Sequence, residues 1–161
     1  MNRRFIISLA IAAVIFALDL WSKEQVLHYF LEQKQPEIAV TGFFNFVLVW
    51  NRGISFGMFA SLNQPYVLLC VSLIVCGILL RWLYKTPSAL VAYAIGPVIG
   101  GALGNALDRV RFTAVVDFLD FHAFGYHWPA FNIADAGIFI GVVLLLFHSM
   151  FIESKSHKEK L

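Results

Sequence analysis

Four long apolar segments constrain the fold of this chain more than any other feature of its 161 residues. They cover about residues 5–21, 66–84, 89–107 and 133–152, and each approaches the roughly 20 residues that a helix needs to cross the hydrocarbon core of a bilayer. A chain this short cannot hide a composition that is 60% hydrophobic and only 14% charged in one soluble core. We therefore predict an all-α membrane protein with four transmembrane helices, folded as a single domain over residues 1–161.

The basic residues that flank these segments predict the orientation in the membrane, because Lys and Arg accumulate in cytoplasmic loops. Seven of the 12 basic residues fall on one side of the predicted spans: Arg3, Arg4, Arg81, Lys85, Lys155, Lys158 and Lys160. Both termini are thus expected in the cytoplasm, an N-in/C-in topology. The first span is expected to be a retained anchor rather than a signal peptide, since no small-residue cleavage site follows it.

The two connections on the opposite side of the membrane differ in length and character. The first, residues 22–65, contains FFNFVLVWNRGISFGMF, a stretch rich in β-branched and aromatic residues that predicts a small sheet on the membrane surface. Before it, SKEQVLHYFLEQ has the pattern of an amphipathic surface helix at the interface. The second connection, residues 108–132, begins with the β-like run VVDFLDF and ends with the aromatic turn HWPAF.

Several classes of site are disfavoured by what the chain lacks. The sequence has no basic patch with interleaved aromatic residues, so nucleic acid is not expected as a partner. Cys70 and Cys76 fall inside the second span without metal or redox spacing, and His122 with His127 forms no recognisable ligand motif. We expect neither a metal nor a cofactor.

Polar residues gather at one end of the predicted bundle. Because successive membrane helices run antiparallel, the ends of the first and third spans lie at the same membrane face as the start of the fourth. This arrangement brings five polar residues to that face: Asp19, Asn105, Asp108, Asn132 and Asp135. Ionisable groups in or beside a membrane segment are costly, so their convergence favours a functional site.

Spacing indicates which of these residues share a helix face. Asp19 and Lys23 are four residues apart with the acid first, the favourable order for a helical ion pair, and we interpret them as structural. Asn105 lies three residues before Asp108 and four before Arg109, so all three share one face. Asp108 and Arg109 fit either a site or a solvated helix boundary.

A glycine at every fourth position marks one face of the third span. Gly96, Gly100 and Gly104 leave that face free of side chains, so another helix can approach closely. We interpret this stripe as a packing surface alone.

Asp117 and Asp135 are the strongest candidates for chemistry. Two carboxylates within hydrogen-bonding reach share a proton, so the ionised one can take a proton from water while the protonated one polarises a carbonyl group. That is the chemistry of an aspartic peptidase. The alternative for this pair is a structural role between loop and bundle, and nearby Asp120 is expected to be water-facing or structural.

Two other functional classes compete with a peptidase. A proton-coupled carrier would relay ions through intramembrane carboxylates, but it predicts polar groups near the membrane midplane rather than at one face. A purely structural assembly partner would pack through the glycine stripe, which leaves the converging acids without a purpose.

Five motifs in this order resemble lipoprotein signal peptidase, also called signal peptidase II. They are Asp19 with Lys23, the tripeptide NRG at 51–53, GGALGNALDR at 100–109, VVDF at 115–118 and FNIAD at 131–135. The resemblance covers the whole chain, including its length and four spans. It implies a four-helix membrane bundle with a small extracytoplasmic β-sheet cradle and an amphipathic surface helix.

The resemblance also implies an activity and roles for individual residues. The activity is that of an aspartic endopeptidase of the bacterial cytoplasmic (inner) membrane, which cuts prolipoproteins just before a diacylglyceryl-modified cysteine on the extracytoplasmic side. Asp117 and Asp135 match the catalytic pair. Positions around the active site are matched by Asn51, Gly53, Asn105, Arg109, Asn132 and Ala134, and supporting positions by Asp19, Lys23 and Asp108. Membrane lipids and the cyclic lipopeptide inhibitor globomycin are the other implied partners, and we expect a monomer.

Overall fold

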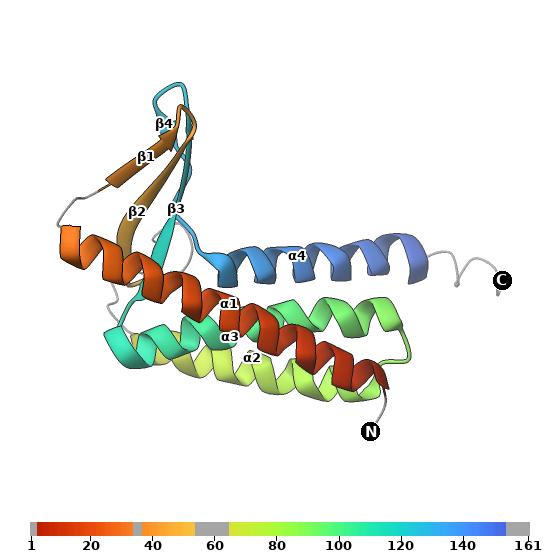
Figure 1. The fold of residues 1–161 in the computed structure, drawn as a ribbon. Helices are drawn as coiled ribbons and strands as arrows, with labels where there is room; N and C mark the ends of the chain where they lie inside the picture. Colours follow the sequence, from red (N-terminus) through yellow and green to blue (C-terminus); the bar gives the residue numbers. More distant parts are fainter. Residues whose placement is uncertain (1–2, 34–36, 54–64, 154–161) are drawn as a thin grey trace.

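The computed structural model describes residues 3–33, 37–53 and 65–153. Four helices in these ranges are long and apolar enough to cross a membrane, which confirms the predicted helical architecture. They are α1 (Arg3–Gln33), α2 (Pro65–Lys85), α3 (Ala89–Phe112) and α4 (Ile133–Phe147), which continues as a π-helix, η3 (His148–Glu153). The start of α1 and the end of α4 lie at the same end of the bundle (Figure 1).

Helix α3 forms the centre of the bundle and packs against each of the other three. Its core residues Ala92, Ala94 and Ile95 are fully buried, whereas α1, α2 and α4 bury only a minor part of their apolar segments. Exposed apolar side chains on these outer helices form the surface that lipid covers. The hydrophobic core therefore centres on α3, with the other three helices packed around it.

The glycine stripe of α3 packs against α1, as predicted. A Cβ atom on Gly96 would lie 2.7 Å from the carbonyl oxygen of Ser8. One on Gly100 would overlap the backbone of Ala12, and one on Gly104 would overlap the carboxylate of Asp19. Glycine is required along this line because the α1 backbone at two positions, and the Asp19 carboxylate at the third, occupy the space of a side chain.

The segments between the helices form one four-stranded antiparallel sheet in the order β1-β2-β3-β4. Its strands are β1 (Glu37–Thr41), β2 (Phe44–Asn51), β3 (Val115–Ala123) and β4 (Tyr126–His127). The sheet therefore draws on both connections, although the sequence pattern assigned it to the first. It stands at the end of the bundle where α1 and α3 end and α4 begins, with strands running across the helix axes (Figure 1).

The register of the sheet places the second connection above the helix ends. Asn51 pairs with Val115, and Val49 pairs with Asp117. Thr113 ends α3 in the left-handed conformation with φ of 57°, so the chain turns sharply and enters β3 two residues later. This turn carries Asp117 to the end of the bundle.

Residues 22–33 are helical, as predicted, but they do not form a helix separate from the first span. That segment continues α1 without interruption, so the helix runs 31 residues and extends well past the predicted end of the first span at residue 21. No Gly or Pro interrupts it, and Leu27 and Phe30 are buried. Helix α3 likewise continues past residue 107 to Phe112.

Some predictions fall on residues 1–2, 34–36, 54–64 and 154–161, which lie outside the described part of the chain. They include the end of the predicted β-rich stretch, residues 54–59, and the basic residues Lys155, Lys158 and Lys160. The N-in/C-in orientation and the single domain remain predictions.

Replacing Gly100 by Ala should destabilise the bundle, because the new methyl group must displace the backbone of α1. We expect a loss of about 1–3 kcal/mol, the usual cost of overpacking. The matched control is Gly77→Ala on α2, where nothing lies within 4 Å of an added Cβ, so the melting temperature should stay level or rise slightly. Thermal unfolding of the two variants in the same detergent checks this, and equal melting temperatures would contradict the packing described here.

Candidate active site

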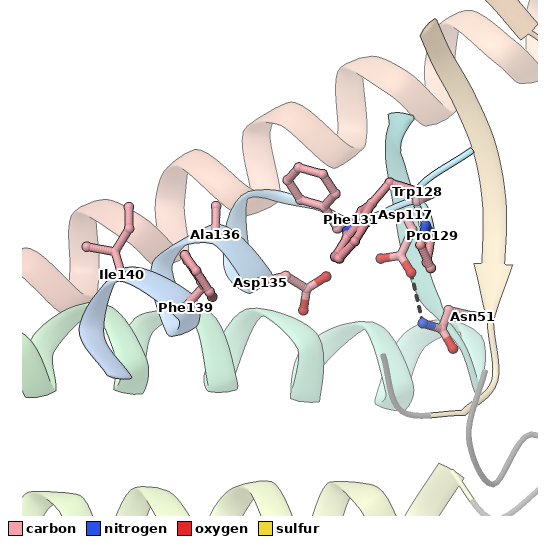
Figure 2. Close-up of a pocket in the computed structure, with 10 residues that line it drawn as sticks. Asn51, Asp117, Trp128, Pro129, Phe131, Asp135, Ala136, Phe139 and Ile140 are labelled. Atoms are coloured by element: carbon pink, nitrogen blue, oxygen red, sulfur yellow. Dashed lines mark hydrogen bonds between the residues drawn. The ribbon is translucent and has the colours of Figure 1, made fainter. Parts of the chain in front are cut away.

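Asp117 and Asp135 come from different elements and face the same space. Asp117 lies on β3 with 2% of its surface exposed, and Asp135 lies in the first turn of α4. Figure 2 shows the two carboxylates turned toward one another below Trp128 and Phe131, which lie in the loop before α4. The structure thus brings together the two acids that the sequence singled out.

Asn132 holds these two elements together. It caps α4: its side-chain oxygen accepts a hydrogen bond from the backbone N–H of Asp135 at 2.9 Å, and its own backbone N–H donates to Asp135 Oδ2 at 3.3 Å. This reciprocal capping box fixes the Asp135 side chain at the helix start. Asn132 Nδ2 also donates to Asp117 Oδ1 at 2.7 Å, so one buried amide contacts both acids.

Two further asparagines donate to the carboxylates. Asn51, at the end of β2, donates from Nδ2 to Asp117 Oδ2 at 2.9 Å. Asn105, on α3, donates from Nδ2 to Asp135 Oδ1 at 2.8 Å. Each acid is therefore held by side chains from separate elements, which fixes its position.

A buried lysine lies behind the pair. Lys23 is 2% exposed, and its ammonium group lies 2.7 Å from Asp19 Oδ2 and 2.9 Å from Asp108 Oδ2. It also donates to Asn105 Oδ1 at 3.0 Å. The predicted ion pair of Asp19 and Lys23 is confirmed, and Asp108 is a buried third member rather than a solvated boundary residue.

The two acids of this cluster also bind backbone groups. Asp19 Oδ1 accepts from the N–H of Ala134 at 2.9 Å, at the start of α4. Asp108 Oδ2 accepts from the N–H of Val116 at 3.1 Å, at the start of β3. Lys23 therefore anchors, through its two carboxylate partners, both elements that carry the candidate acids.

Arg109 ties the end of β2 to the bundle. Its guanidinium donates to the carbonyl oxygens of Asn105 at 3.1 Å and Gly53 at 3.2 Å. Gly53 in turn donates its N–H to Asn51 Oδ1 at 3.0 Å. Arg109 and Gly53 thus orient Asn51, which contacts Asp117 directly.

The environment of Asp117 disfavours its charged form. Burial, reinforced by the nearby charge of Asp135, raises the pKa of Asp117 from 3.8 to about 7, despite the hydrogen bonds from Asn51 and Asn132 that lower it. A carboxyl group with this pKa carries a proton at and below neutral pH, as a general acid requires.

A cleft of about 500 Å³ opens over the two carboxylates. Its walls are mostly apolar, and Phe139 and Ile140 extend it onto the exposed side of α4. The residues that line it are Asn51, Asp117, Trp128, Pro129, Ala130, Phe131, Asp135, Ala136, Phe139 and Ile140. The sequence pattern identified the polar floor but missed these apolar walls; the only local signal was the aromatic turn HWPAF just before the FNIAD motif.

Asp120 lies outside this site, and the expectation that it faces water is wrong. It is 5% exposed and accepts hydrogen bonds from Asn45 Nδ2 at 3.0 Å and from His127 Nδ1 at 2.9 Å. The rings of His122 and His127 stack with centroids 4.8 Å apart. Asp120 therefore has the structural role that was the other expectation.

Comparisons with known proteins agree on one family. A family profile described as signal peptidase (SPase) II matches residues 11–151. The chain is 40% identical over 145 residues to the lipoprotein signal peptidase of Anaplasma phagocytophilum (strain HZ), covering 89% of this chain and 92% of that one. It is 35% identical over 161 residues to the lipoprotein signal peptidase of Pelagibacter ubique (strain HTCC1062), covering 98% and 96%.

Solved structures support the same fold. One, described as a bacterial membrane enzyme, superposes with a TM-score of 0.74 at 29% identity and covers 89% of each chain. Another with the same description has a TM-score of 0.74 at 28% identity, covering 90% of this chain and 93% of that one.

The raised pKa of Asp117 predicts how the stability of the protein depends on pH. A folded-state pKa near 7 against an unfolded value of 3.8 means that the folded protein holds the extra proton between these values, so this group lowers stability as pH rises from about 4 to 7. Asp117→Asn removes that dependence. Its free energy of unfolding relative to the unmodified protein should therefore increase between pH 5 and pH 8, by about 2–3 kcal/mol, and its relative melting temperature should rise with it.

Differential scanning fluorimetry in detergent across this pH range measures the effect. The control is Glu37→Gln at an exposed position of β1, which should follow the unmodified protein at every pH. A constant difference between Asp117→Asn and the unmodified protein from pH 5 to pH 8 would contradict the raised pKa.

Proposed function

The chain belongs to the signal peptidase II family, and from this premise we propose that it is an aspartic endopeptidase in which Asp117 and Asp135 activate water. The observation that carries the proposal is the carboxylate pair of the buried Asp117 and the half-buried Asp135, bridged by Asn132 at the floor of an apolar cleft. Two acids in one low-dielectric site cannot both ionise easily, so the pair works with one shared proton.

The reaction needs only these two groups and a water molecule. The ionised carboxylate takes a proton from water as the water oxygen attacks the scissile carbonyl carbon, and the protonated carboxyl gives its proton to the carbonyl oxygen. The tetrahedral intermediate then collapses: the C–N bond breaks, and the leaving amine takes up a proton from the acid that received it. One hydroxyl group of the intermediate returns its proton to the other carboxylate and becomes the carbonyl oxygen of the new carboxyl terminus. One water is consumed and the pair returns to its starting state.

The cleft suits a substrate that is part peptide and part lipid. Its polar floor offers amide and carboxyl groups for a peptide bond, while Phe139 and Ile140 connect its apolar wall to the exposed side of α4. Acyl chains on the residue after the scissile bond can extend along that side into the bilayer. We therefore propose cleavage of prolipoproteins immediately before a diacylglyceryl-modified cysteine.

The proposed setting is the cytoplasmic membrane of a bacterium, with the site on the extracytoplasmic side. The supporting observations are the four helices long enough to span a bilayer and the basic residues Arg3, Arg4, Arg81 and Lys85 at the end of the bundle opposite the acids. At this depth the acids meet a peptide whose lipid chains hold it at the membrane surface. Globomycin is the expected inhibitor.

Asp117→Asn and Asp135→Asn should each abolish cleavage, by at least about 1000-fold, because an amide can neither take a proton from water nor supply one at neutral pH. Purified variants are incubated with a diacylglyceryl-modified prolipoprotein, and mass spectrometry scores the loss of the signal peptide. Asp120→Asn is the matched control: another buried aspartate on β3, outside the cleft, it should retain activity.

The unlipidated prolipoprotein provides the substrate control and should remain intact. Substantial cleavage by either of the first two variants would remove the pair from the mechanism. If the unmodified protein cleaves neither substrate, ion flux in liposomes becomes the next measurement, since a carrier is then the remaining use for membrane carboxylates.

A further inference from the structure

The hydrogen bonds around Lys23 have only one possible direction. An ammonium group donates and cannot accept, so the side chain of Asn105 must present its oxygen to Lys23. The NH₂ group of the same amide then points away from Lys23 and donates to Asp135 Oδ1 at 2.8 Å. A buried charge thus fixes the orientation of an amide that contacts one of the two acids.

Asp135 accepts a hydrogen bond on each of its carboxylate oxygens. Oδ1 accepts from Asn105, and Oδ2 accepts from the backbone N–H of Asn132. The residue also lies in the first turn of α4, where the helix dipole favours negative charge. Both the donors and the dipole stabilise the ionised form.

Asp117 also accepts on both carboxylate oxygens, from Asn132 Nδ2 at 2.7 Å and from Asn51 Nδ2 at 2.9 Å, but other features give it weaker support for a negative charge. It lies on a strand and therefore gains nothing from a helix terminus. Its contact with Asn132 Nδ2 is shared with two other acceptors, Asn105 Oδ1 at 3.1 Å and the carbonyl oxygen of Val116 at 3.2 Å. Its second donor, Asn51, is only partly buried at the end of β2.

The charged groups around the pair also favour a negative charge on Asp135 over one on Asp117. Helix α1 contributes Lys23 and Asp19, and helix α3 contributes Asp108 and Arg109. Lys23 is one amide away from Asp135, through Asn105, but two amides away from Asp117, through Asn105 and Asn132. The β2 residue that contacts the pair is Asn51, whose side chain is neutral.

From this geometry we infer that Asp135 is the ionised member of the resting pair and Asp117 the protonated member, with Lys23 as the positioning residue that sets the assignment through Asn105. The inference rests on the proposed function. The pKa of about 7 at Asp117 agrees with it. Asp135 then takes the proton from water, and Asp117 gives its proton to the scissile carbonyl oxygen.

The pH dependence of kcat/KM for the lipidated substrate tests the assignment, because its two limbs report the pair in the free enzyme. Asn105→Ala removes a donor from Asp135 and therefore raises the pKa at which Asp135 becomes protonated. The low-pH midpoint of the kcat/KM profile (the acid limb) should then shift upward by about one pH unit. Asn51→Ala removes a donor from Asp117, so Asp117 should keep its proton to a higher pH. The basic limb should then move up by a similar amount.

The reverse pattern would overturn the inference: Asn51→Ala moving the acid limb and Asn105→Ala the basic limb. Unchanged limbs in both variants would overturn it too. Should Asn105→Ala not fold, the Asn51 variant decides alone, since Asn51 lies at a strand end and is only partly buried. A different result would contradict the proposed function itself. If Asp117→Asn or Asp135→Asn still cleaves the substrate, the pair is not catalytic, regardless of the pH profiles of the asparagine variants.

Discussion

The geometry of the site depends on one interaction, the contacts of the Lys23 ammonium group. This group is buried, and it contacts Asp19 on its own helix and both Asp108 and Asn105 on α3. Through the two carboxylates it also holds the backbone N–H groups at the start of α4 and at the start of β3. Removing one partner from a buried charge cluster leaves an unpaired charge and costs several kcal/mol. Helices α1, α3 and α4 and the sheet therefore meet at one point, and the candidate catalytic acids lie beside it.

The glycine stripe makes this cluster possible. Close contact of α1 and α3 brings Gly104 against the carboxylate of Asp19, at the end of the bundle where Lys23 contacts Asp19 and Asp108. The sheet then covers the cluster, and β3 carries Asp117 over the start of α4. What remains open is an apolar cleft that reaches the lipid-facing side of α4. A peptidase for lipid-modified proteins needs water and an ionisable pair beside the bilayer, and this arrangement places such a pair at the floor of the cleft.

Local spacing predicted the parts of this site that lie within one element. The four-residue separation of Asp19 and Lys23 indicated their ion pair, and the three-residue separation of Asn132 and Asp135 reappears as a capping box. Contacts between distant segments were beyond such patterns. The burial of Asp120 depends on Asn45, which is 75 residues away, and the walls of the cleft form only when the loop before α4 folds over the acids. The continuation of α1 to residue 33 was missed because a pattern of polar and apolar residues does not distinguish a new surface helix from an extension of the preceding one.

The most direct test of the central role of Lys23 separates its effect on stability from its effect on the acids. A triple variant with Asp19→Asn, Lys23→Met and Asp108→Asn has no unpaired buried charge, so it should fold with a melting temperature close to that of the unmodified protein. Asn105 then has no cation to fix its amide, and kcat/KM on the lipidated prolipoprotein should fall at least about 10-fold. A folded triple variant that cleaves at the unmodified rate would contradict the account, because the acids would then hold their geometry without the buried lysine.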